Sequence, residues 1–131
     1  MTILVAYSHT DEGAAALVHA ARLSAQDAQD LVVFDLDASS TADDGSIAPG
    51  PLPEGAVSDG QNVSWRGPDH QSQDAAGDLL DVAEQLGADA IVVGVRRRSR
   101  VGKLILGSMA QKIIIDANVP VIAVKADRHE R

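Results

Sequence analysis

A chain of 131 residues with a formal net charge of −8 at pH 7 fits one domain with one hydrophobic core, and it is too acidic overall to present the broad basic face that binds duplex nucleic acid. The chain has no cysteine, which excludes disulfides, thiolate catalysis and zinc–thiolate sites. No early segment combines a basic start with a long apolar run, so we expect a cytoplasmic protein with neither a signal peptide nor a membrane span.

The first half of the chain begins with a strand and a helix. The apolar run Thr2–Tyr7 predicts a buried strand, and Thr10 can cap a helix that continues to about Gln26 on the spacing of its alanine, leucine and valine residues. A second β-rich run covers residues 31–36. Residues 37–61 are rich in Pro, Gly, Ser and acidic side chains, without a helical apolar stripe. We expect this segment to be a flexible surface loop, dispensable for folding, and its functional alternative is a lid or a partner-binding segment.

The second half of the chain alternates strands and helices. A weak strand at residues 62–66 precedes a helix with apolar residues at Leu79, Val82, Ala83 and Leu86, which Gly87 can end in a left-handed conformation. A strand over residues 88–95, a helix capped by Ser108 and ended by Asn118, and a last strand at residues 120–125 follow. Strands that are apolar throughout and separated by amphipathic helices predict a doubly wound α/β domain with a parallel sheet covered on both faces.

Positive charge is concentrated late in the chain. Residues 1–93 carry two basic and sixteen acidic side chains, whereas residues 94–131 carry nine basic and three acidic ones. Five of those cations, Arg96, Arg97, Arg98, Arg100 and Lys103, stand between Gly94 and Gly107. Here a strand ends, a loop follows, and a helix begins near Gly107. This order places backbone N–H groups and a helix dipole at the carboxyl edge of the sheet, as in phosphate sites. The alternative is that these arginines only form a solvated loop.

The loop has neither of the two common nucleotide motifs. It is not a Walker A loop, because Leu104 follows the "VGK" of residues 101–103, and no G-x-G-x-x-G follows any expected strand. However, Gly94 with Arg97, nine intervening residues and then Gly107-Ser108 resembles the G-x2-G-x9-G-(S/T) motif of nucleotide-binding universal stress proteins. "ADAIVVG", "NVPVIAVK" and "EGAAALVHAARLSAQ" also resemble that family. The resemblance implies a five-stranded sheet of the kind seen in adenine nucleotide alpha-hydrolases, here with the second helix replaced by the 37–61 loop.

Three positions depart from the pattern of the family. Arg97 stands where the motif has its second glycine, and Gly102 can supply the flexibility that Arg97 removes. Ser8, followed by His9, stands where many members have an aspartate that contacts the nucleotide. Asp35 stands where members have an apolar residue beside the adenine.

Catalytic and metal-binding patterns are not recognisable. The four histidines, His9, His19, His70 and His129, have no ligand or triad spacing, and no pair of aspartates is placed as a general acid and base. We therefore predict that the protein is not an enzyme and has no metal site. His9 is expected to share a crevice with the Gly94 loop, because the first and fourth strands are neighbours in the sheet of the family.

The resemblance implies a stress-associated regulator that binds an adenine nucleotide, namely ATP, with ADP or AMP as alternatives. The implied site residues are Ser8, His9, Asp35, Gly94, Arg97, Arg98, Gly102, Lys103, Gly107, Ser108 and Met109. The rival hypotheses are a protein–protein interaction module that binds no nucleotide and, ranked last, slow ATP hydrolysis or phosphate transfer. The apolar residues 121–124 predict a homodimer through the last strand. We expect no nucleic-acid or membrane partner.

Overall fold

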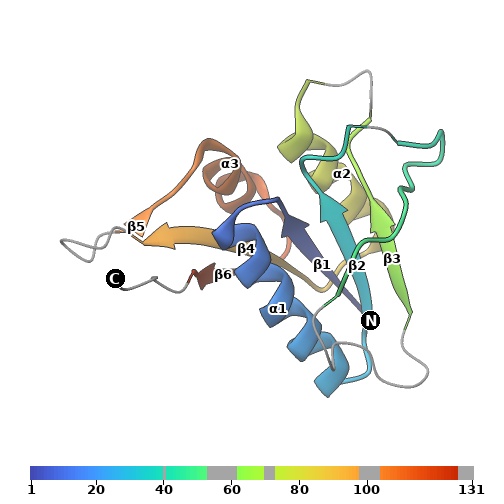
Figure 1. The fold of residues 1–131 in the computed structure, drawn as a ribbon, viewed down its shortest axis with the longest axis horizontal. Coiled ribbons are helices and arrows are strands. Elements are labelled where there is room, and N and C mark those ends of the chain that lie inside the picture. The colour runs from blue at the N-terminus through green and yellow to red at the C-terminus, as the bar shows by residue number, and fades with distance from the viewer. Residues whose placement is uncertain (40, 53–61, 70–72, 98–103, 127–131) are drawn as a thin grey trace.

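A computed structural model describes residues 1–39, 41–52, 62–69, 73–97 and 104–126. These parts of the chain form six strands and three helices (Figure 1). In chain order they are β1 (Thr2–Tyr7), α1 (Asp11–Gln26), β2 (Asp30–Asp35), β3 (Val63–Arg66), α2 (Ala75–Leu86), β4 (Ala90–Arg97), β5 (Leu104–Ile105), α3 (Ser108–Asp116) and β6 (Val121–Lys125). Of the helices in these ranges, not one has the length and apolar character needed to cross a bilayer.

Five strands form a parallel sheet in the order β3-β2-β1-β4-β6, and the two-residue β5 runs antiparallel to the end of β4. Val5 of β1 pairs with Val33 of β2 on one side and with Val92 of β4 on the other. The predicted doubly wound α/β fold is confirmed. The direction of winding reverses between β1 and β4, which fixes where a ligand crevice is expected.

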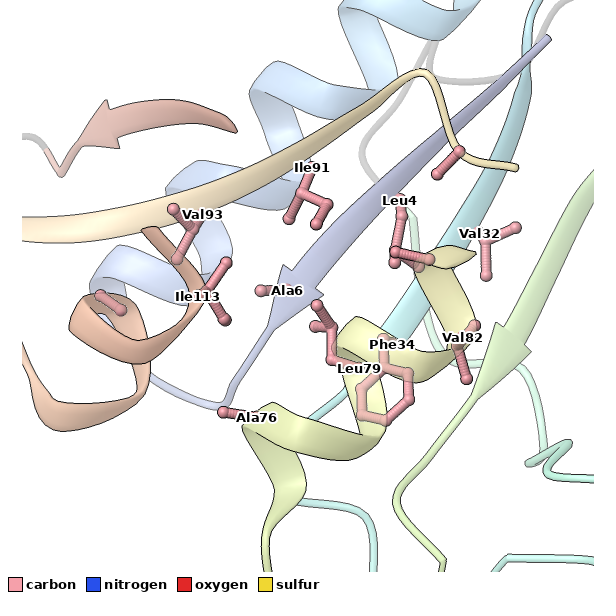
Figure 2. Close-up of a cluster of buried hydrophobic side chains, with 13 residues drawn as sticks. Leu4, Ala6, Val32, Phe34, Ala76, Leu79, Val82, Ile91, Val93 and Ile113 are labelled. Carbon is pink, nitrogen blue, oxygen red and sulfur yellow. The ribbon is translucent and has the colours of Figure 1, made fainter. Parts of the chain in front are cut away.

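Helices cover both faces of the sheet (Figure 1). Alternate strand residues point to opposite faces, so Ile3 and Val5 pack with α1, whereas Leu4 and Ala6 face α2 and α3. Figure 2 shows the cluster between the sheet and helices α2 and α3. Leu79 and Val82 of α2 and Ile113 of α3 point toward strand residues, namely Leu4, Val32, Phe34, Ile91 and Val93. Burial of these apolar side chains supplies the main driving force for folding.

Three of the five predicted helix ends are confirmed, among them the end of α1 at Gln26. The Thr10 Oγ1 accepts a hydrogen bond from the Gly13 N–H at 3.1 Å, and Gly87 ends α2 in the left-handed conformation with φ of 61°. The ends predicted for α3 are wrong. Gly107 is its N-cap, so Ser108 is already the first helical residue, and α3 ends before Asn118. The Asn118 side chain instead donates a hydrogen bond to Glu84 Oε2 at 2.7 Å, which ties the end of α3 to α2.

The described part of the 37–61 segment, residues 37–39 and 41–52, contains no helix, in agreement with the sequence. The sequence predicts that this segment is a surface loop, dispensable for folding, but two of its side chains, Ile47 and Leu52, are partly buried against the cluster on the α1 face. The Ile47 N–H donates to the Trp65 carbonyl at 3.2 Å, and Gly50 lies against the Trp65 ring. Irregular chain therefore packs on β3, because its one aromatic side chain, Trp65, gives a short segment enough apolar surface to pack on.

Candidate functional site

A pocket of about 110 Å³ lies at the carboxyl edge of the sheet, where β1 and β4 are neighbours. This is the point at which open α/β sheets bind ligands, because the connections leave the two strands toward opposite faces. Twelve residues line the pocket: Ala6, Ser8, Glu12, Gly13, Leu36, Val93, Gly94, Arg96, Gly107, Met109, Ala110 and Ile113. The pocket therefore combines the ends of two strands with the first turns of α1 and α3.

The structure brings four of the predicted site residues together around this pocket, namely Ser8, Gly94, Gly107 and Met109. Ser108 is exposed at the start of α3 and is not among the lining residues. Arg97 is the last residue of β4, where its backbone pairs with Leu104. The other three predicted residues of the loop, Arg98, Gly102 and Lys103, lie outside the described residues.

Gly94 has a packing role that the motif alone does not reveal. A β-carbon at Gly94 would meet the backbone carbonyl of Glu12, so only glycine lets the first turn of α1 lie against β4. Gly13 is similarly close to the backbone of Ser8. In contrast, a β-carbon at Gly107 would meet no atom within 4 Å, and the φ of Gly107 is −66°. Packing with the described residues therefore explains a glycine at position 94 but leaves Gly107 unexplained.

An ion pair stands at the pocket between residues that the sequence did not place there. Arg96 Nη2 lies 3.1 Å from Glu12 Oε2, with the arginine side chain 62% exposed and the glutamate 22% exposed. The sequence counted Arg96 among the cations, and it predicted for Glu12 only a favourable interaction with the dipole of the helix that Thr10 caps. The available signal was that Glu12 lies in the first turn of the helix that follows β1, and β1 is the neighbour of β4. The charge of Arg96, one of the five cations between Gly94 and Gly107, is thus partly neutralised by a carboxylate of the protein itself.

The amino end of α3 offers unsatisfied backbone donors to this pocket. Thr10 caps α1 and Asp74 caps α2 through side-chain oxygens, whereas no side chain among the described residues caps α3. The first N–H groups of a helix have no acceptor within the helix, and its dipole favours negative charge there. Because Gly107, Met109 and Ala110 line the pocket, an anion bound in it lies close to these donors.

His9 does not belong to the described lining of this pocket, in contrast to the expectation that it shares a crevice with Gly94. Its Nε2 lies 3.0 Å from Asp35 Oδ2, and this hydrogen bond and the carboxylate charge raise the pKa of His9. The His9 backbone N–H donates to Asp37 Oδ2 at 2.8 Å. The predicted residues His9 and Asp35 are therefore joined to each other, together with Asp37, which the sequence did not single out.

A larger pocket of about 460 Å³ lies between the 41–45 segment and α2. Its lining includes Arg66 and five aspartates, Asp43, Asp44, Asp69, Asp78 and Asp81. Carboxylates repel phosphate at neutral pH, so this pocket suits an adenine nucleotide poorly despite its size. The smaller pocket beside α3 is the better candidate for an anion.

Comparison with known proteins shows similarity to one protein family. The model of the Universal stress protein family matches residues 69–125. Over 52 residues the chain is 44% identical to a universal stress protein of Mycolicibacterium smegmatis, and the match covers 40% of each protein. The carboxyl-terminal part of the chain is therefore similar to universal stress proteins. The matched segments span only 31% to 40% of the length of the curated relatives, so most of each relative lies outside the match.

Solved universal stress proteins share the fold along almost the whole chain. One from Archaeoglobus fulgidus is 24% identical, covers 95% of this chain and 97% of its own, and superposes with a TM-score of 0.64. A universal stress protein in complex with cAMP is 14% identical, with coverages of 97% and 98% and a TM-score of 0.61. An Archaeoglobus fulgidus protein in complex with dAMP is 19% identical, with coverages of 95% and 96% and a TM-score of 0.58. These likenesses extend the shared fold to the amino-terminal half.

Proposed function

We propose that this protein belongs to the universal stress protein family and is a stress-associated, cytoplasmic regulator that binds an adenine nucleotide, namely ATP, at the pocket between β1 and β4. The observation that carries the proposal is the arrangement of Ser8, Gly94 and Gly107 around the start of α3, which no side chain of the described residues caps. The cAMP and dAMP complexes of structurally similar universal stress proteins support the adenine class of ligand.

In this proposal the phosphates lie at the backbone N–H groups of Gly107, Ser108 and Met109, and the Ser108 hydroxyl assists. Arg97, Arg98 and Lys103 neutralise the phosphate charge. Ligand pockets commonly measure roughly 300–1,000 Å³, and this one, at about 110 Å³, holds only part of a nucleotide. Recognition therefore depends mainly on phosphate, with the nucleoside lying along the sheet edge, and affinity rises from AMP to ADP to ATP.

We propose a binding role rather than catalysis. Among the residues that line the pocket, Glu12 is the one carboxylate, and Arg96 already holds it in an ion pair. A general base needs a carboxylate that is able to accept a proton from the attacking group. The site thus favours retention of the nucleotide over its hydrolysis.

The same family fold supports a proposed homodimer through β6. In the described structure β6 pairs with β4 alone, so its other side is an edge that carries the half-buried Ile122 and Val124. An unpaired apolar edge readily pairs with a second copy of the same strand. The alternative function, an interaction module without nucleotide, rests on the small volume of the pocket and would use such an edge.

Calorimetry with ATP, ADP and AMP on wild-type protein and on Gly107→Ala tests the nucleotide proposal. The alanine fits the empty space at Gly107, so the chain should stay folded, with a melting temperature lowered only slightly by the weaker N-cap, while its methyl group obstructs the phosphate. We expect ATP affinity to fall at least about tenfold, which corresponds to about 1.4 kcal/mol. Absence of ATP binding by the wild type would sink the nucleotide proposal and leave the interaction module, and equal binding by Gly107→Ala would contradict the assigned pocket.

A further inference from the structure

A histidine and two aspartates meet at the carboxyl edge of β1 and β2, outside the lining of the pocket beside α3. Tyr7 pairs with Asp35 at the ends of these adjacent parallel strands, so the residues that follow both strands emerge side by side. A nitrogen of His9 and carboxylate oxygens of Asp35 and Asp37 all lie within 4.8 Å of one another. These atom types are metal ligands when histidine is neutral and the carboxylates are ionised.

Backbone hydrogen bonds hold the two carboxylates in place. Asp35 Oδ1 accepts from the Asp37 N–H at 2.9 Å, and Asp37 Oδ2 accepts from the His9 N–H at 2.8 Å. Asp35 is only 8% exposed, which restricts its rotamers further. Ligands that are themselves hydrogen-bonded bind a metal more tightly, because less conformational freedom is lost when the ion enters.

The spacing of the donor atoms suits one small ion. His9 Nε2 and Asp35 Oδ2 are 3.0 Å apart. Two ligands at about 2.0–2.1 Å from a tetrahedral ion lie roughly 3.3 Å apart, so a small movement of the exposed imidazole admits the ion. The His9 side chain is 59% exposed, which leaves it free to make that movement.

We propose that His9, Asp35 and Asp37 bind one divalent transition-metal ion of the Zn²⁺ class. Imidazole nitrogen favours zinc and its neighbours, whereas Mg²⁺ and Ca²⁺ prefer sites made of oxygen alone. Three protein ligands leave a coordination position for water or for a small ligand, as in open zinc sites. The sequence did not reveal this site because its ligands lie at or just beyond the ends of two strands, with 25 residues between His9 and Asp35.

Zinc titration of the full chain, stripped of metal with a chelator and free of nucleotide, tests the site by calorimetry. Wild type should bind one Zn²⁺ per chain. His9→Gln, and Asp37→Asn, which keeps an oxygen acceptor for the His9 N–H, should each lose at least about tenfold in affinity. The matched control replaces His19, His70 and His129 together with glutamine and should bind zinc as the wild type does.

Three readings separate this site from incidental metal binding. Co²⁺ should give visible absorption bands with wild type that are lost in His9→Gln, and Mg²⁺ should not compete with Zn²⁺ at similar concentrations. Circular dichroism without metal should be the same for all variants. No zinc binding by wild type, or affinity unchanged in both His9→Gln and Asp37→Asn, would overturn the site, as would loss of binding in the control. Equal affinity of the wild type for Mg²⁺ and Zn²⁺ would contradict the assignment of the site to transition-metal ions.

Discussion

Gly94 of β4 lies directly against the backbone carbonyl of Glu12 in the first turn of α1. These residues are 82 positions apart in the chain, and their contact fixes how α1 meets the sheet. The same glycine belongs to the motif that the sequence assigns to nucleotide binding. Stability and ligand affinity therefore have to be measured separately for substitutions at this position.

Gly94→Ala should destabilise the protein by about 3 kcal/mol, within the range for overpacked cores, because the added methyl group meets backbone that cannot rotate away. Gly107→Ala is the comparison, because a β-carbon there meets no atom within 4 Å, and the weaker N-cap should lower its free energy of unfolding by only about 1 kcal/mol or less. Urea unfolding of both variants checks this. Equal stability of the two would show that α1 can shift to accept a side chain at position 94.

Glu12→Gln should tighten ATP binding roughly fivefold, because the change removes a negative charge from the pocket and frees Arg96 to face phosphate. Calorimetry at low and moderate salt measures the change, which should shrink as salt rises. Glu84→Gln, which removes the same charge from α2 away from this pocket, is the control. Unchanged affinity in Glu12→Gln would place the phosphates elsewhere.

Ile47→Ala should lower the free energy of unfolding by about 1 kcal/mol, because Ile47 is half-buried against the cluster that includes Trp65. Replacing residues 41–52 with a Gly/Ser linker should lower it further, contrary to the expectation from composition. Thermal unfolding checks both, with the exposed Ala48→Ser as control. A melting temperature unchanged by the linker would show that the segment is dispensable after all.

Asp74 Oδ2 and Lys112 Nζ lie 2.6 Å apart and form an ion pair between α2 and α3. This ion pair should stabilise the contact only at pH values between the folded pKa of Asp74 and the folded pKa of Lys112. The hydrogen bond to Lys112 lowers the pKa of Asp74 below 3.8, and the same bond raises the pKa of Lys112 above 10.5. The aspartate contribution is present above pH 3.8 and is lost as pH falls through its folded pKa. The lysine contribution is present below pH 10.5 and is lost as pH rises through its folded pKa.

A double-mutant cycle with Asp74→Asn and Lys112→Met measures this coupling, and asparagine preserves the helix cap. The coupling free energy should be favourable and equal at pH 6 and pH 8, and it should vanish when the pH falls below the folded pKa of Asp74. A coupling that stays constant through strong acid would contradict the ion-pair assignment.

Ala123→Pro should dissociate the proposed dimer without unfolding the chain. The Ile91 N–H donates to Pro120 and the Ala126 N–H donates to Val95, so the ladder alternates and the Ala123 N–H points away from β4. Proline removes that outward donor, which is tolerated at a sheet edge. Light scattering should show a dimer for wild type and for Ala123→Thr, and a monomer for Ala123→Pro. A monomeric wild type at micromolar concentration would exclude the dimer.

Local signals in the sequence located β1, α1 and β2 to within a residue or two, because buried apolar runs and a capping threonine act over short distances. The two-residue β5 gave no such signal, since it exists through pairing with the end of β4. The same limit applies to the candidate site. The motif indicated Gly94 and Gly107, but the Arg96–Glu12 ion pair joins residues 84 positions apart and depends on the packing of α1.

The central position of β1 also has a consequence for synthesis of the chain. Ile3 pairs with Ala90, so one side of β1 has no partner strand until β4 has left the ribosome. At about 5–20 residues per second, that delay is roughly 4–17 s. During this time the nascent chain exposes an apolar edge of residues 2–7, which is a template for aggregation. Truncated products that end before β4 should therefore depend on chaperones, whereas chains that reach β6 can close the sheet on both sides of β4.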